Sequence, residues 1–270
     1  MNHDVNALYP ALSALAKIHN KDLNELAKKS SHHDNYLGLA DCCYVVFNGL
    51  STRSGAVCAN YLATLNEYVL YLDHSAADYV WKQLVSGPRS TFLDTLGEAT
   101  WYLHFKNKGY GVTTHVPFED NNRSSGDVDL VVTAETTEWW LDVYSTGATL
   151  PKIPDNRPGP HRAYGRKLED VVMEIDKKAQ KKFHDKFSST VRTGRLKGKL
   201  LGLLICIQKE DHAFLLPLYN AQISGKDVSP PFDLFTEKRN GLHVVLVNIL
   251  SAPNDSEILQ PVILCQWCRK

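Results

Sequence analysis

The residues of this chain best suited to chemistry are two aspartates in apolar, strand-like segments. Asp129 lies near the start of one such segment, and Asp142 is enclosed between Leu141 and Val143 in the next. Alternate side chains of a strand face opposite ways, so Asp142 and Tyr144 share a side. Burying a carboxylate costs free energy unless something pairs with it, and a divalent cation is a natural partner. The two acids therefore predict a metal site that could activate water and stabilise a phosphodiester displacement.

A third acid completes a pattern known from one group of nucleases. Glu98 lies on a predicted helix, Asp129 begins a strand and Asp142 follows on the next strand. This arrangement resembles the PD-(D/E)XK superfamily, which includes type II restriction enzymes and archaeal Holliday-junction resolvases, over about residues 89–210. The resemblance implies a restriction-endonuclease-like α/β fold, with a mixed sheet flanked by helices. It also implies a metal-dependent endonuclease in which Glu98, Asp129 and Asp142 are catalytic and bind Mg²⁺ or Mn²⁺.

The chain departs from this pattern at one position. The lysine of the family motif would stand at position 144, where the chain has Tyr144. A phenol with an ordinary pKa of about 10 is neutral at pH 7 and supplies no positive charge. Some members of the superfamily recruit the basic residue from the following helix, and here Lys178 is the candidate general base or charge stabiliser, with Lys182 as the other candidate. Two alternatives remain: an inactive nuclease-fold module that binds nucleic acid or a protein partner, and a structural α/β domain without a metal.

Residues 1–88 are predicted to form an all-helical segment in front of the α/β domain, which spans residues 89–270. Apolar side chains recur every three or four residues from Val5 to Leu15 and again from Val57 to Leu72. Gly87-Pro88 interrupts the pattern. We expect a helical bundle or arm here, which could contact a protein partner or a second copy of the chain.

The second half is predicted to contain helices and strands in mixed order, which is typical of an α/β sandwich. Its first helix should be capped by Ser90 or Thr91 and end at Lys108-Gly109, and a long helix is expected over residues 162–187. The predicted strands are Tyr110–Phe118, Val128–Thr133, Trp139–Ser145, Leu200–Ile207, Ala213–Leu218, Leu242–Ile249 and Val262–Cys268.

Charge is balanced over the whole chain but separated locally. Residues 89–142 hold nine acidic and four basic side chains, whereas residues 152–199 hold fourteen basic and six acidic ones. An acidic cluster beside a basic stretch is what a metal site facing a polyanion requires. We therefore expect the stretch 152–199 to bind nucleic acid, either DNA or RNA; the alternative is an ordinary solvated helix face.

Other classes of protein are disfavoured. The six cysteines do not form a disulfide framework, and Cys265 and Cys268 lack the further ligand pair of a zinc site. His104 and His115 are expected to be packed or surface residues. No apolar stretch approaches the roughly 20 residues of a membrane span, and no signal peptide is recognised, so a cytoplasmic protein without a membrane contact is expected. Phosphate-binding loops, nucleophile elbows and His-Glu-x-x-His motifs are also missing from the sequence.

Overall fold

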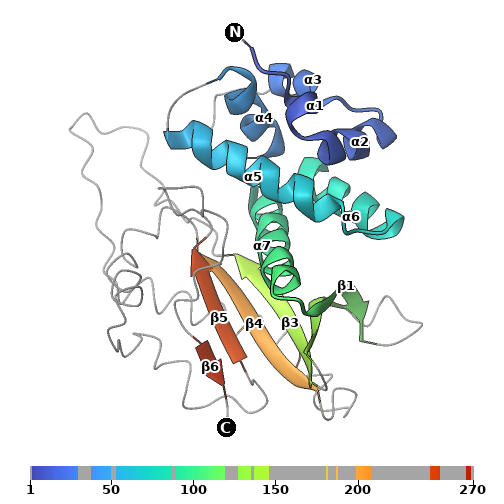
Figure 1. Ribbon diagram of the computed structural model, residues 1–270, viewed down its shortest axis with the longest axis vertical. Helices are drawn as coiled ribbons and strands as arrows, with labels where there is room; N and C mark the ends of the chain where they lie inside the picture. Colours follow the sequence, from blue (N-terminus) through green and yellow to red (C-terminus); the bar gives the residue numbers. More distant parts are fainter. Residues whose placement is uncertain are drawn as a thin grey trace, which may run out of the picture.

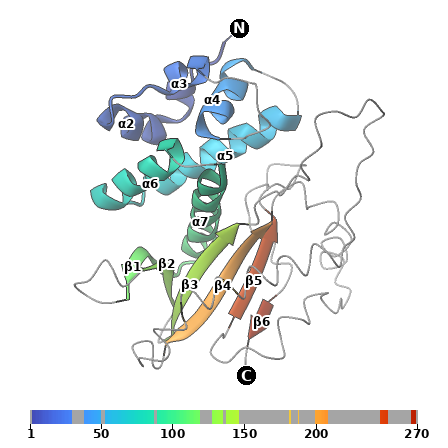
Figure 2. The same ribbon diagram turned by 180° about the vertical axis from the view of Figure 1, so that it is seen from behind.

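The fold was analysed in a computed structural model. In the residues that it describes, a helical layer stands above a mixed sheet (Figures 1 and 2). The described residues are 2–29, 38–49, 53–86, 89–118, 127–134, 137–145, 181, 187, 199–207, 244–249 and 266–268.

The N-terminal layer is all-helical in its described residues, as the apolar repeats predicted. The repeat from Val5 to Leu15 is divided between two helices, because Pro10 occupies the start of α2, where its missing N–H is not needed. The helices of this layer are α1 (Val5–Leu8), α2 (Pro10–Ile18), α3 (Leu23–Lys29), α4 (Leu39–Phe47), α5 (Arg53–Val69) and α6 (His74–Ser86).

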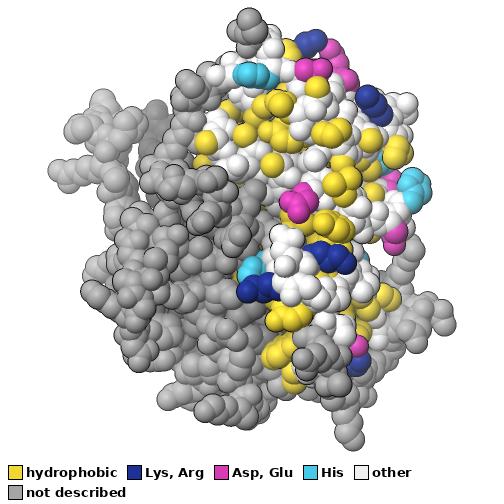
Figure 3. Space-filling view, in the orientation of Figure 1, with side chains coloured by type: hydrophobic (Ala, Val, Ile, Leu, Met, Phe, Trp, Pro, Cys, Tyr) yellow, Lys and Arg dark blue, Asp and Glu magenta, His cyan; other side chains and the backbone are white. Residues whose placement is uncertain are grey.

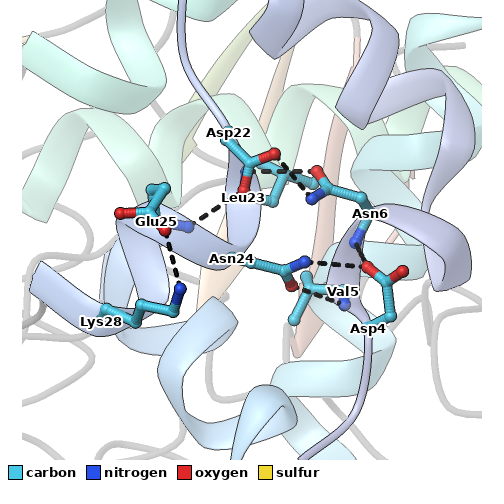
Figure 4. A network of polar contacts seen from close by, with 8 residues as sticks. All are labelled: Asp4, Val5, Asn6, Asp22, Leu23, Asn24, Glu25 and Lys28. Carbon is cyan, nitrogen blue, oxygen red and sulfur yellow. Dashed lines mark hydrogen bonds and ion pairs between the residues drawn. The ribbon is translucent and has the colours of Figure 1, made fainter.

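A network of polar contacts ties α1 to the start of α3 (Figure 4). The Oδ1 atom of Asp22 accepts a hydrogen bond from the backbone N–H of Glu25 at 3.0 Å, which caps α3. Asn6 donates its amide to Oδ2 of Asp22 at 2.9 Å. Burial pushes the pKa of Asp22 upward, but these hydrogen bonds outweigh it and hold the pKa below its ordinary value. The carboxylate of Asp22 therefore connects α1 to the start of α3.

Replacing Asp22 by alanine should lower the free energy of unfolding by about 1 kcal/mol, the usual effect of losing an N-cap. Since the folded protein lowers the pKa of Asp22, this contribution is present above the ordinary pKa of 3.8 and is lost as the pH falls below it. Urea unfolding at pH 7 and pH 3 measures both effects. Glu25→Ala is the matched control, because Glu25 makes only an exposed ion pair with Lys28 and should leave the midpoint unchanged. Equal midpoints for the two variants would contradict the capping role.

Helix α7 (Arg89–Asn107) lies between the helical layer and the sheet (Figures 1 and 2). It begins at Arg89, so the expected cap residues Ser90 and Thr91 lie in its first turn; the cap prediction was wrong by one or two residues, the usual uncertainty of a helix boundary. Its buried side chains lie on two opposite faces of the helix, because α7 packs against α5 and α6 on one side and against the sheet on the other.

The sheet is mixed and six-stranded, in the order β1-β2-β3-β4-β5-β6. The first three strands are antiparallel, β3/β4 and β4/β5 are parallel, and β5/β6 is antiparallel. This confirms the predicted mixed α/β class. The strands are β1 (Gly111–Pro117), β2 (Asp127–Ala134), β3 (Thr137–Ser145), β4 (Leu200–Ile207), β5 (Val244–Ile249) and β6 (Gln266–Cys268).

Some sequence predictions fall on residues that are not described. The strand expected over 213–218 lies outside the described residues, and so does the long helix over 162–187, apart from Lys181 and Phe187, which are both helical. The last strand is described only from Gln266 to Cys268. Cys42, Cys43, Cys58 and Cys206 are buried free thiols, as expected.

Close packing seats α7 on β3 and β4. Ser145 donates its hydroxyl to the carbonyl of Leu93 at 3.0 Å, and its backbone N–H to Asp94 at 3.1 Å. A Cβ atom at Gly97 would lie 2.8 Å from the sulfur of Cys206, so only glycine allows this approach. The next residue of α7 is Glu98. The contacts of Leu93, Asp94 and Gly97 therefore also fix the distance of Glu98 from the sheet.

Figure 3 shows hydrophobic side chains spread over the face formed by the N-terminal helices. Exposed hydrophobic side chains of the helical segment and its turns include Ile18 and Leu70, at 59% and 68%. Within the described ranges, no helix has the length and apolar character that a membrane span needs.

Candidate functional site

The two aspartates singled out from the sequence occupy neighbouring positions of β2 and β3. Leu130 pairs with Leu141 in the antiparallel ladder, so the next position along, Asp129, lies opposite Asp142. Residues directly opposite in such a ladder share a face of the sheet. Leu130, Leu141 and Val143 belong to the core beneath α7, which places the two aspartates on the other face.

Both aspartates are buried. Asp142 is fully buried and Asp129 is 9% exposed. The Oδ2 atom of Asp129 accepts a hydrogen bond from the backbone N–H of Val143 at 2.7 Å, next to Asp142 in the chain. This bond fixes the Asp129 carboxylate against β3 and supports a charge that would otherwise be costly at this depth.

His115 of β1 lies on the strand next to β2, at the position opposite Asp129. The pairs Thr114–Leu130 and Val116–Val128 flank His115 and place it opposite Asp129. His115 has a φ of 50°, in the left-handed region that a residue with a side chain rarely adopts. Strand alternation alone would point His115 away from α7; the unusual backbone conformation explains why its side chain instead meets α7 and α6.

On that side the His115 ring lies between two carboxylates. Its Nε2 atom is 3.7 Å from Oε2 of Glu98, and its Nδ1 atom is 3.9 Å from Oδ2 of Asp127. Its ring also meets the ring of Tyr79 edge-on, at 4.7 Å between centroids. Glu98 thus contacts His115 on the α7 side of the sheet, whereas Asp129 and Asp142 belong to the other face. Backbone strain of this kind persists where the surroundings over-determine it, and it is concentrated at functional sites.

Tyr68 of α5 lies within the electric field of the same acids. Its side chain is fully buried, and among the described residues its hydroxyl has no hydrogen-bond partner. Burial raises the pKa of Tyr68 well above its ordinary value, and the negative charges of Glu98 and Asp129 raise it further. Burial and these negative charges therefore keep Tyr68 a neutral phenol at pH 7.

The remaining predicted site residues are placed as follows. Tyr144 lies on β3 and is half-buried, two residues beyond Asp142. Lys178 and Lys182 lie outside the described residues. Among the residues that the structure describes, no three His, Cys, Asp or Glu side chains are close enough to hold a metal ion as they stand. Joint binding of one ion by Glu98, Asp129 and Asp142 stays a prediction.

The sequence reasoning missed His115 and Tyr68. His115 was assigned a packing or surface role, and nothing in the local sequence signals its positive φ. His104, assigned in the same way, does pack against the Trp101 ring, and burial lowers its pKa to about 4. Tyr68 lies in the helical segment. The aromatic stripe there gives no sign that the Tyr68 hydroxyl is influenced by the charges of Glu98 and Asp129.

No family model, no curated protein and no solved structure matches this chain.

Proposed function

We propose that this protein is a metal-dependent nuclease that hydrolyses phosphodiester bonds in nucleic acid. The observation that carries the proposal is the fully buried Asp142 opposite Asp129 on one face of the sheet. Glu98 lies on α7, over the other face, and joins the proposed set through the sequence resemblance. A helix followed by three antiparallel strands and a parallel fourth agrees with the restriction-endonuclease-like fold that the sequence resemblance implies.

The donor set fits the proposed cofactor. Glu98, Asp129 and Asp142 are carboxylates, the hard oxygen ligands that Mg²⁺ and Mn²⁺ prefer. One or two such ions, when bound, would lower the pKa of a water molecule and offset the charge that develops on the phosphate. The hydrogen bond from Val143 orients Asp129, and His115 limits the positions of Glu98. Lys178 is the proposed source of the positive charge that Tyr144 does not supply.

The basic stretch 152–199 is the proposed contact to the nucleic-acid backbone. Lysine and arginine side chains that neutralise phosphates release bound counterions, so the affinity should fall steeply as salt is added. An affinity that is insensitive to salt would instead indicate a solvated face.

The proposal predicts cleavage that depends on added metal. We expect the protein to cut end-labelled DNA or RNA in Mg²⁺ or Mn²⁺ and to lose this activity in EDTA, because the carboxylates alone supply neither a nucleophile nor positive charge. Gel analysis of the fragments measures the result, and re-addition of Mn²⁺ to the chelated sample should restore cleavage. Intact substrate under every metal condition would contradict the proposal.

Tyr144 favours one further candidate, a nuclease-fold module that binds nucleic acid or a protein without cutting. Its phenol leaves the motif without its usual cation. The exposed Ile18 of α2 and Leu70, which directly follows α5, would suit a protein partner or a second copy of the chain. Salt-sensitive binding of nucleic acid without cleavage in any metal is the result expected of such a module.

A further inference from the structure

An open cleft of about 670 Å³ lies beside His115, the residue that contacts Glu98. It lies between the end of α5, helix α6, helix α7 and strand β1, and its lining includes Tyr71, Tyr79, Tyr102, His115 and Asp127. Its volume is in the range of sites that hold a small molecule or one unit of a polymer. The cleft is not visible in the sequence, because it forms only where helices α6 and α7 meet strand β1.

The cleft includes residues next to the candidate acids. The His115 ring lines the cleft and contacts Glu98 at 3.7 Å. Asp127, also part of the lining, stands two residues before Asp129 on β2. A polymer bound with one unit in the cleft would therefore place its next bond near Glu98 and Asp127, the acids beside His115.

The tyrosines present aromatic surface to the cleft. Tyr71 and Tyr79 are 45% and 46% exposed, so part of each ring is accessible to a ligand. Their positions are set by neighbours: Tyr71 packs on Tyr102 at 5.8 Å between centroids, and Tyr79 meets His115 edge-on. Lys106 lies 5.7 Å from the centre of the Tyr71 ring and adds a positive charge beside it. Rings that are already ordered lose little entropy when a flat ligand stacks on them.

The charges of the cleft favour an uncharged aromatic group over a phosphate. Asp73 accepts a hydrogen bond from the N–H of Ala76 at 2.8 Å, and Asp78 pairs with Lys82. Lys82 also lines the cleft and offsets Asp78, so the acidic excess that would repel an entering phosphate comes from Asp73 and Asp127. A nucleobase carries no charge and has a flat π face, so it can stack on tyrosine while its phosphate stays outside.

We propose that this cleft receives an unpaired base, so that the substrate class is single-stranded nucleic acid or the unpaired part of a longer molecule. The proposal rests on the nuclease function proposed above and deepens it. A paired base inside a duplex cannot reach the tyrosines without leaving its stack. The acids beside His115 then meet the phosphodiester next to the bound base.

The test measures binding in EDTA, where no cleavage occurs, by fluorescence anisotropy of a labelled single-stranded DNA 15-mer and of the matching duplex. Tyr79→Ala should weaken single-strand binding about five- to hundredfold, the range for one lost base stack, and leave duplex binding unchanged. Tyr79→Phe should restore it, because the flat face is kept. Tyr110→Ala is the matched control: Tyr110 is 38% exposed and is not part of the cleft lining.

The outcomes separate this proposal from the one on which it rests. Wild-type protein that binds duplex as tightly as single strands, or does not bind single strands, overturns the cleft proposal. Equal affinities for Tyr79→Ala and Tyr110→Ala, with matching melting temperatures, overturn it as well. Tyrosine-dependent binding without cleavage in any metal would support the cleft and refute the nuclease. Cleavage that is indifferent to Tyr79 would support the nuclease and refute the cleft.

Discussion

Asp142→Asn should reduce metal-dependent cleavage by about 10³-fold, in the middle of the range for removing a group that acts at the reacting atoms. Asp142 is fully buried on β3, and asparagine fills the same space, so the fold should survive the change. What is lost is the negative charge that a divalent cation requires of its ligand. Initial rates in saturating Mg²⁺ and Mn²⁺ measure the effect, and calorimetric titration with Mn²⁺ should show weaker binding in parallel.

Two further variants make this test specific. Asp129→Asn should give a similar loss, because its amide oxygen can still accept the hydrogen bond from Val143 while the charge disappears. Glu138→Gln should leave the rate unchanged, although Glu138 lies on the same strand as Asp142. It is four residues away, roughly 13 Å along a strand, and its carboxylate is held by Lys199 and Trp140. An Asp142→Asn protein that cuts at the wild-type rate would exclude the proposed role of Asp142.

The sequence was most informative where local pattern and tertiary structure agree. The apolar runs around Asp129 and Asp142 become β2 and β3, and their spacing matches a short hairpin with the two acids opposite each other. A charge inside a buried strand was visible without any structure, because such positions are almost always apolar. The mixed class of the sheet followed from the order of the elements.

The parts that could not be predicted depend on a single backbone angle and on long-range packing. Alternation assumes an extended strand, and His115 breaks it with a φ of 50°, so its side chain meets Glu98 on the α7 side. Glu98 and Asp129 influence the pKa of Tyr68, and Tyr79 meets His115, only because α5, α6 and α7 pack together. The residues next to these tyrosines in the sequence do not predict this packing, because an aromatic stripe on a helix shows which side is buried but not which element covers it.

Gly97→Val should destabilise the protein by about 3 kcal/mol or more, and Gly97→Ala by about 1–2 kcal/mol. Replacing glycine by alanine inside a helix normally gains about 1 kcal/mol, so the sign of the alanine result is itself informative. The added Cβ would lie 2.8 Å from Sγ of Cys206 and 3.0 Å from Oγ of Ser145. Neither atom can move away easily, because Cys206 is fully buried and the Ser145 hydroxyl is hydrogen-bonded to the carbonyl of Leu93.

A double-mutant cycle attributes the loss to this contact. Cys206→Ala removes the sulfur that the new methyl group would strike, so combining it with Gly97→Ala should cost less than the two single changes together, by about 1 kcal/mol or more. Urea unfolding of the four proteins provides the free energies. The cycle also tests the site, because Glu98 follows Gly97 and any displacement of α7 would move its carboxylate away from His115. A Gly97→Ala protein more stable than wild type would show that α7 does not approach β4 so closely.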